Sequence, residues 1–373
     1  MTDLPFPRFG PALAPAASCD CRVCPFNMDN PSAAEPICAG CSSTCEFCTC
    51  AASEGSAVDH ADTCAGCSIR CGSRTDIHAW MADVGGTLLF DDIGASGECP
   101  DLPSYVPQVD GKVTSLDGRL FWPAYAVGLR RVVSPRSFRV SPMFRGRSAH
   151  TALGLGAQQR AVLVGYGEDA LVEAYWTHRH RRGLAEEIAA MGWDLILAPN
   201  LSVYRNQPRA ENLINMRRNL MVASELAALG ATAAPCLYWL RLEDLHRYAV
   251  WSQGNADRLP AVAVNLQTFR SSADWEEIAV PGLAFLAATL PEDLPVVITG
   301  TSTADRLAQL VHFFGARLRL VSQHALQLAR HGRLLTAEGE VFSRSLPVDL
   351  FTENVRHYAS LVEGCERADG GRG

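Results

Sequence analysis

Short apolar runs alternate with longer stretches of mixed polarity from about residue 87 to the end of the chain. Each run has the length and the β-rich composition of a buried strand, and the stretches between runs are long enough for helices. The predicted strands are residues 87–90, 126–133, 161–164, 194–198, 233–239, 261–266, 295–299 and 317–321. Eight strands alternating with helices predict a parallel sheet closed into a barrel.

The stretch at residues 209–229 is the clearest predicted helix. Its apolar residues Leu213, Met216 and Leu220 recur at spacings of three and four, and Gly230 follows as a C-terminal cap. The region 100–156 is rich in Pro, Gly, Ser and Arg, so the first two strands are the least well defined. The predicted fold class is α/β, a (β/α)8 TIM-like barrel preceded by a small cysteine-rich segment, with an open doubly wound sheet as the alternative.

Residues 1–80 differ from the rest because they have few large apolar side chains and hold a dense cysteine cluster. A CxxC pair lets two thiolates from one turn reach one tetrahedral ion, so repeated pairs predict a metal site that supplies the folding energy of this segment. We expect structural zinc; an iron–sulfur cluster fits the same thiolates, and a disulfide knot would need an oxidising compartment. The predicted metal ligands are Cys19, Cys21, Cys24, Cys38, Cys41, Cys45, Cys48, Cys50, Cys64, Cys67 and Cys71. The predicted domains are therefore residues 1–80 and 81–373.

The net charge of -7 excludes a basic coat over the whole protein. Lys112 is the only lysine, so almost every positive charge is an arginine, the side chain best suited to gripping phosphates. Two basic runs stand out, and a solvated surface is the alternative reading of both. The predicted nucleic-acid-binding residues are Arg130, Arg131, Arg179, Arg181 and Arg182. The N-terminus lacks the pattern of a signal peptide and no apolar run reaches membrane-spanning length, so we expect a cytoplasmic protein without a membrane partner.

Residues that follow each predicted strand are the candidates for chemistry, because barrel active sites form at the carboxyl ends of the strands. They are Asp91 and Asp92; Asn200, Ser202, Tyr204 and Arg205; Trp239; Asn265 and Gln267; Thr301; and Ser322 and His324. Taken singly, each has a structural alternative: the two aspartates start a turn, Asn200 caps a loop, and Trp239 belongs to the core.

The segment 299–341 resembles the end of the catalytic barrel in the tRNA-guanine transglycosylase superfamily, some members of which act on bases in DNA. The matching positions are Gly300, Thr301, Asp305, Gly315, Ala329, Arg330, Gly332, Thr336, Glu338 and Gly339. The CxCxxC at residues 19–24 is similar to that family's zinc motif, although here it precedes the barrel. Residues 198–219 also resemble an uncharacterised bacterial barrel family found in mobile elements and phages.

The resemblance implies an enzyme that acts on the N-glycosidic bond of a nucleic-acid base. The family's nucleophilic aspartate would fall near residues 320–322, where this chain has no carboxylate. We therefore expect a DNA glycosylase that removes a modified base, with antiviral defence against modified phage DNA as its role. Asp92, Asn200 and Tyr204 are the expected catalytic residues: a carboxylate, a water-positioning amide and a base-edge donor.

Asn265 and Gln267 would also contact the base edge, and Trp239 would stack on its face. The alternatives are a non-catalytic nucleic-acid-binding module, a base-exchanging transglycosylase on tRNA or DNA, and an iron–sulfur redox or radical enzyme.

Overall fold

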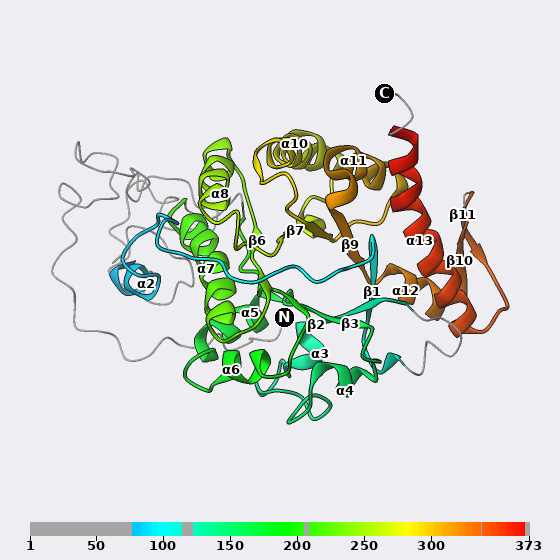
Figure 1. The fold of residues 1–373 in the computed structure, drawn as a ribbon, viewed down its shortest axis with the longest axis horizontal. Coiled ribbons are helices and arrows are strands. Elements are labelled where there is room, and N and C mark those ends of the chain that lie inside the picture. The colour runs from blue at the N-terminus through cyan, green and yellow to red at the C-terminus, as the bar shows by residue number, and fades with distance from the viewer. Residues whose placement is uncertain (1–76, 114–121, 205–208, 337, 370–373) are drawn as a thin grey trace, which may run out of the picture. The chain divides into compact units, whose positions relative to one another are not determined.

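The computed structural model describes residues 77–113, 122–204, 209–336 and 338–369 (Figure 1). The chain divides into two compact units. Residues 1–90 and 201–221 form one, which we call the α7 unit because it holds most of helix α7 (Arg209–Ala228). Residues 91–200 and 222–373 form the other, which we call the barrel unit.

The barrel unit contains a nearly closed barrel of nine parallel strands. The strands are β1 (Tyr105–Val109), β2 (Ala124–Gly128), β3 (Arg160–Val164), β4 (Leu195–Leu197), β5 (Ala233–Ala234), β6 (Cys236–Leu237), β7 (Val262–Asn265), β8 (Val296–Thr299) and β9 (Leu318–Ser322). Their order is β5-β4-β3-β2-β1-β9-β8-β7-β6. The predicted α/β class with a parallel barrel is thereby confirmed.

The two end strands of this order are consecutive in the chain, with Pro235 alone between them. The Ala198 amide donates to the Ala234 carbonyl at 2.9 Å on one side, and the Ala263 amide donates to the Pro235 carbonyl at 2.9 Å on the other. The continuous segment of β5, Pro235 and β6 therefore lies between β4 and β7, with β5 paired to β4 and β6 paired to β7. When β5 and β6 are counted together, the ring has eight strand positions.

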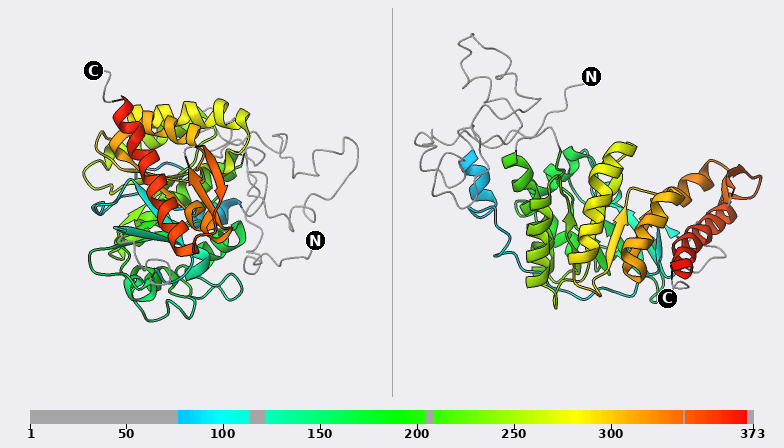
Figure 2. Two further views of the ribbon diagram at one scale, coloured as in Figure 1. Left: turned by 90° about the vertical axis from the view of Figure 1, so that its right-hand side faces the viewer. Right: turned by 90° about the horizontal axis from the view of Figure 1, so that it is seen from above.

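Helices follow most strands and surround the barrel (Figure 1). They are α3 (Leu129–Val132), α4 (Ala149–Leu153), α5 (Asp169–His178), α6 (Leu184–Ala189), α8 (Leu242–Gly254), α9 (Ser272–Asp274), α10 (Val280–Thr289), α11 (Ala304–Phe314), α12 (His324–Arg330) and α13 (Pro347–Asp369). The antiparallel hairpin of β10 (Arg333–Thr336) and β11 (Gly339–Phe342) lies beside α13 in both views of Figure 2. Asn354 ties them together: its side chain accepts from the Leu335 amide and donates to the Arg333 carbonyl.

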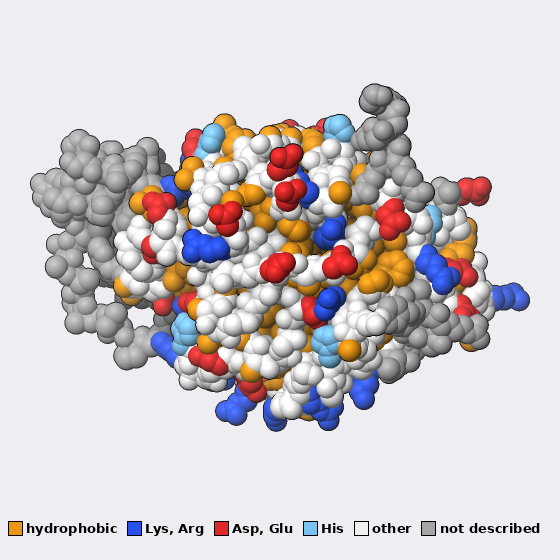
Figure 3. Space-filling view, in the orientation of Figure 1, with side chains coloured by type: hydrophobic (Ala, Val, Ile, Leu, Met, Phe, Trp, Pro, Cys, Tyr) orange, Lys and Arg blue, Asp and Glu red, His pale blue; other side chains and the backbone are white. Residues whose placement is uncertain are grey.

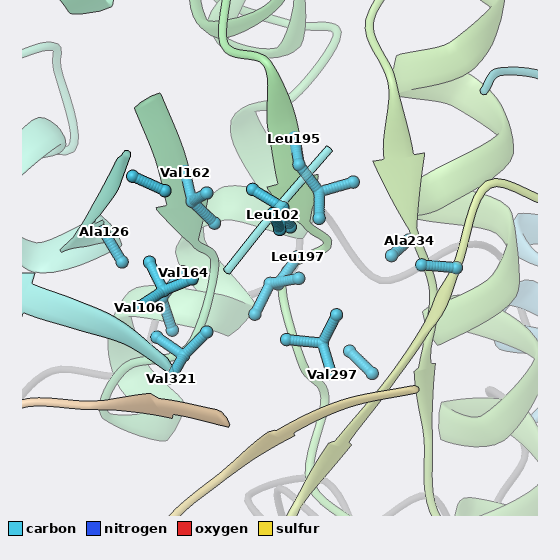
Figure 4. Packing of buried hydrophobic residues seen from close by; sticks show 13 residues of the cluster. Leu102, Val106, Ala126, Val162, Val164, Leu195, Leu197, Ala234, Val297 and Val321 are labelled. Carbon is cyan, nitrogen blue, oxygen red and sulfur yellow. The ribbon is translucent and has the colours of Figure 1, made fainter. Parts of the chain in front are cut away.

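The barrel interior is filled by small and branched side chains from alternate strand positions (Figure 4). Ala126, Val164, Leu197 and Val297 belong to this buried cluster, and Leu102 joins it from the segment before β1. Strands buried on both faces read as continuous apolar runs, which is why most of them are visible in the sequence.

Two sequence predictions about strands are wrong. Residues 87–90 form no strand, and the first strand among the described residues is Tyr105–Val109, which the apolar runs did not predict. Pro107 and Gln108 interrupt its apolar pattern, and a proline in a strand lacks the N–H of a ladder bond. The second predicted strand, 126–133, is in fact β2 followed at once by the short helix α3, so Arg130 and Arg131 lie on a helix.

The described part of the α7 unit comprises α2 (Ile77–Asp83), the segment that follows it, residues 201–204 and α7 up to Met221. Every residue from Ala210 to Leu220 is buried, including polar ones. Arg217 donates to the carbonyl of Val84 at 2.6 Å and to that of Leu89. The Asn219 side chain accepts a hydrogen bond from the Leu201 backbone amide and donates one to the Leu201 carbonyl. The polar side chains of α7 therefore fasten two distant segments of the chain.

Candidate functional site

At the carboxyl ends of several barrel strands, the last side chain that faces the barrel interior is polar. Inward positions recur every two residues along a strand, so Gln108, Tyr166 and Asn265 follow the core residues Val106, Val164 and Ala263. Contacts support this arrangement: a Cβ built on Gly128 would lie 3.1 Å from the Gln108 Nε2, and Tyr166 packs against the core cluster. We call this polar layer the barrel mouth.

Tyr166 brings an unsatisfied hydroxyl to the barrel mouth. This buried oxygen has no hydrogen-bonding nitrogen or oxygen among the described residues, and its polar neighbour is the Cys236 thiol, a weak hydrogen-bonding group. Burial, and then Cys236, raise the pKa of Tyr166 well above its usual value. Burial also raises the pKa of the Cys236 thiol to about 12, so at neutral pH the thiol is protonated and is not a nucleophile. An orphaned buried hydroxyl is costly unless a ligand satisfies it.

Asn200, predicted from the sequence, follows β4 next to the end of β3. The two strand ends approach closely: a Cβ on Gly165 would lie 2.4 Å from the Leu197 carbonyl oxygen, which only glycine permits. Asn200 is buried, and its Oδ1 has no hydrogen-bond partner within the described part of the chain. Adjacent strand ends thus carry a buried donor, Tyr166, and a buried acceptor, Asn200, neither of which is satisfied.

Asn265 and the residues around it form the opposite side of the mouth. Asn265 Oδ1 accepts from the Gln267 amide at 3.1 Å and from Thr299 Oγ1 at 3.4 Å, and the nitrogen Nδ2 is the donor of the same side chain. Gly300 has a φ of 82°, and a Cβ there would lie 2.4 Å from the Gln267 nitrogen. The turn after β8 therefore needs glycine, and it brings the buried Thr301 beside the mouth.

The carboxylate of the mouth is Asp110, at the end of β1. Arg330 binds both of its oxygens at 2.7 Å, and Arg131 binds Oδ2 at 2.8 Å. The hydrogen bond from Arg330 is the main reason that the pKa of Asp110 is lowered, so this carboxyl is ionised at neutral pH. Because β1 was missed in the sequence, Asp110 was missed as well; the rule of strand ends would have found it.

Asp91 and Asp92 lie on an exposed turn that follows no strand. The next residues lead to the far end of α8: Trp251 Nε1 donates to the Ile93 carbonyl at 2.7 Å, and the Ala95 amide donates to Asn255 Oδ1 at 2.9 Å. Since α8 starts at the carboxyl end of β6, its own end lies toward the opposite side of the barrel. The basis for choosing Asp92 as the catalytic carboxylate is therefore absent.

Trp239 is a core residue and does not face the mouth. Its Nε1 donates to the Ile278 carbonyl at 3.1 Å, its ring packs 5.7 Å from that of Phe269, and a Cβ on Gly282 of α10 would clash with it. Both faces of β6 are buried, so the apolar run alone could not tell which side Trp239 takes. The neighbouring Tyr238 holds the inward position and donates to Thr268 Oγ1 at 3.3 Å.

Ser322 and His324 belong to a separate polar cluster outside the barrel. His324 Nδ1 pairs with the Tyr358 hydroxyl of α13, and Tyr105 donates to the Ser322 carbonyl. Burial lowers the pKa of His324, although Glu340 opposes this. An open cavity of about 640 Å³ adjoins this cluster, lined by His324, Gln327, Leu328, His331, Arg333, Glu340 and Phe342.

The remaining predicted residues belong to the other unit, to ion pairs or to the core. Ser202 and Tyr204 belong to the α7 unit, where the Ser202 carbonyl accepts from Asn215, and Arg205 lies outside the described residues. Arg130 and Arg131 form ion pairs with Glu168 and Asp110. Arg179 is buried, stacks on Trp176 and pairs with Glu225 at 2.8 Å, so it cannot reach a phosphate.

The predicted metal ligands, Cys19 to Cys71, all lie outside the described residues. Within the described part of the chain, no three His, Cys, Asp or Glu side chains come together as a metal site. No helix there is long and apolar enough to cross a membrane. No protein-family model matches this sequence, and no curated protein matches it.

Proposed function

We propose that this protein is a base-processing enzyme of the transglycosylase-like (β/α)8 class and that it cleaves the N-glycosidic bond of a modified base in DNA. The observation that carries the proposal is the pair of unsatisfied buried groups beyond the carboxyl ends of β3 and β4, the Tyr166 hydroxyl and the Asn200 Oδ1. A donor and an acceptor above an apolar floor suit the edge of a planar heterocycle, because binding would satisfy both groups at once. The Asn265 amide adds a second donor.

Asp110 supports the chemical part of the proposal. Cleavage of an N-glycosidic bond builds positive charge on the sugar, and an ionised carboxylate stabilises that charge or orients a water molecule. The low pKa of Asp110 keeps it charged at neutral pH. Arg131 and Arg330 orient it, and their half-exposed guanidinium groups have further N–H donors for the flanking phosphates.

The test is release of free base from modified and unmodified DNA duplexes. We expect release from modified DNA by the wild-type protein and loss of release in Asp110→Asn, with DNA binding kept. Asp92→Asn is the matched control, because Asp92 is an exposed carboxylate that follows no strand. Loss of release in Asp92→Asn with full activity in Asp110→Asn would overturn the assignment.

A non-catalytic nucleic-acid-binding module is the second candidate. The observation in its favour is that both Asp110 oxygens are already engaged by arginines. This candidate predicts that wild type and Asp110→Asn bind DNA alike and that neither releases a base from any duplex, modified or not. The defence role is tested by plating modified phage on cells that express wild type or Asp110→Asn.

A further inference from the structure

Two arginine-rich segments that are far apart in the sequence share one surface of the barrel unit. The first is the loop 133–148 between α3 and α4, and the second is the connection 179–183 between α5 and α6. Arg182 donates to the Ser137 carbonyl at 3.3 Å, and the rings of Phe138 and His178 pack 5.8 Å apart. We call the combined surface the arginine face.

The first segment is an ordered loop. Val133 and Val140 form an antiparallel bridge, and the Ser134 amide donates to the Arg139 carbonyl at 2.9 Å. Phe138 has a φ of 52°, a left-handed conformation that a bulky residue rarely adopts, and its contact with His178 helps to hold it there. The backbone of this loop therefore fixes where its arginine side chains begin.

The second segment is anchored by buried contacts. Arg179 stacks on Trp176 with 3.4 Å to the ring centroid and pairs with Glu225, which also lies 3.4 Å from His180. These contacts use Arg179 and His180 for structure. Arg181 and Arg182 are left exposed to solvent.

The arginine face carries uncompensated positive charge. Its exposed arginines form no ion pair with any described residue, in contrast to Arg130, Arg131, Arg160 and Arg333, which all do. The unpaired ones are Arg136, Arg139, Arg145, Arg147, Arg181 and Arg182. Blue side chains gather along the lower edge of Figure 3, below α4 and α6 of Figure 1. Burial lowers the pKa of His178, and the positive charges of Arg182 and Arg181 lower it further.

We propose that the arginine face binds the phosphate backbone of a nucleic-acid duplex. Guanidinium groups bind phosphates through two parallel hydrogen bonds, and an ordered row of them matches a regularly charged, stiff polymer. The exposed large apolar residues of the described chain all lie elsewhere, so this face has nothing to insert into a membrane. Arg130 and Arg131 of α3 directly precede the first segment in the chain, and Arg131 pairs with Asp110. The choice of DNA as the polymer rests on the proposed function.

The test compares two triple variants. Arg136→Gln/Arg139→Gln/Arg147→Gln removes charge from the arginine face, and Arg258→Gln/Arg344→Gln/Arg356→Gln removes the same charge elsewhere. All six side chains are exposed and make no side-chain hydrogen bond to a described residue, so both variants should fold as the wild type does. A thermal melt of each verifies this.

Fluorescence anisotropy of a labelled duplex, measured over a range of salt concentrations, gives the result. Each lost phosphate contact reduces the slope of log K against log salt by about 0.9, so the face variant should lose up to about 3 units of slope and the control variant none. Equal slopes for the two variants would overturn the proposal. So would equal or tighter binding of the wild type to polyglutamate or to anionic phosphatidylserine vesicles, with the same dependence on these arginines.

This result is separable from the enzymatic proposal. Asp110→Asn should bind the duplex with the wild-type slope whether or not a base is released. If no base is released but the face variant loses slope, the arginine face stands and the glycosylase does not. If a base is released and the two variants have equal slopes, the glycosylase stands and the arginine face does not.

Discussion

Asp110 and Asp194 have similar partners at opposite ends of the barrel. Asp194 precedes β4, where it pairs with His150 at 2.7 Å and with Arg160 at 3.2 Å, and it also accepts from the Ala161 amide at 2.8 Å. The bonds to Asp110 come from two half-exposed arginine side chains. A carboxylate bonded to a strand backbone is part of the scaffold, whereas one held by arginine side chains can exchange partners when a ligand arrives. The difference agrees with the rule that barrels put stability at the amino ends of their strands and chemistry at the carboxyl ends.

The largest expected effect separates the two aspartates by activity. Asp110→Asn should lower the rate of base release by at least about 100-fold, because it removes the charge opposite the developing cation. Asp194→Asn should keep the wild-type rate as long as it is folded. The measurement is single-turnover base release by both variants. Comparable losses of rate would show that Asp110 has no catalytic role that Asp194 lacks.

The order of the two aspartates should be reversed for stability, where Asp194 should matter more than Asp110. Asp194→Ala leaves the Ala161 amide without its acceptor between two strands, so we expect a loss of about 2 kcal/mol in the free energy of unfolding. Asp110→Ala should cost less than half of that, since its arginine partners return to water. Urea denaturation followed by fluorescence gives both values. A larger loss for Asp110→Ala would make Asp110 the structural residue.

Tyr166→Phe sharpens the meaning of the unsatisfied hydroxyl. Because that oxygen has no hydrogen-bonding nitrogen or oxygen among the described residues, its removal should leave the free protein as stable as before or more stable, by up to about 1 kcal/mol. Base release should nevertheless fall by about 10-fold, since one ligand contact is lost. A destabilised but fully active variant would show that the hydroxyl serves the fold alone.

The smallest expected effect is on how the free energy of unfolding changes with pH in the acid range. The pKa of Asp110 is lower in the folded protein than in the unfolded chain, so its contribution to stability is fully present above the usual carboxyl pKa of about 4 and is lost as the pH falls through the folded value. Wild type should therefore lose more stability than Asp110→Asn below about pH 4. Parallel acid titrations of the two proteins would contradict this.

The apolar runs predicted the barrel well because its strands are buried on both faces. They failed at β1, where Pro107 breaks the pattern, and this one failure moved the expected carboxylate from Asp110 to Asp92. Asn200 and Thr301 could be singled out because they lie two residues beyond the predicted strands 194–198 and 295–299, and Asn265 because it ends β7. Tyr166 lies two residues after the predicted strand 161–164 but was not among the predicted site residues, and nothing in the sequence shows that Gly165 serves a close approach to β4.

Long-range contacts explain what sequence reading could not reach. The periodicity of residues 209–229 predicts α7 correctly, yet it contains no sign that Arg217 reaches the carbonyls of Val84 and Leu89. Nothing local separates Arg179, which is buried, from Arg181, which is exposed. The partners of both arginines come from parts of the chain that only folding brings near.

The Pro235 kink has a consequence for how the barrel assembles. It divides the ring into two half-sheets, β1 to β5 and β6 to β9, each made by neighbouring strands of the chain. The halves are joined covalently at Pro235, and their strands pair where β1 meets β9, Tyr105 against Leu320. That pairing closes a very long loop and should be the slow step of folding, because its entropy is lost before any contact is gained. The protein is thus built as two half-barrels, and a chain cut at this position and supplied as two fragments should reassemble.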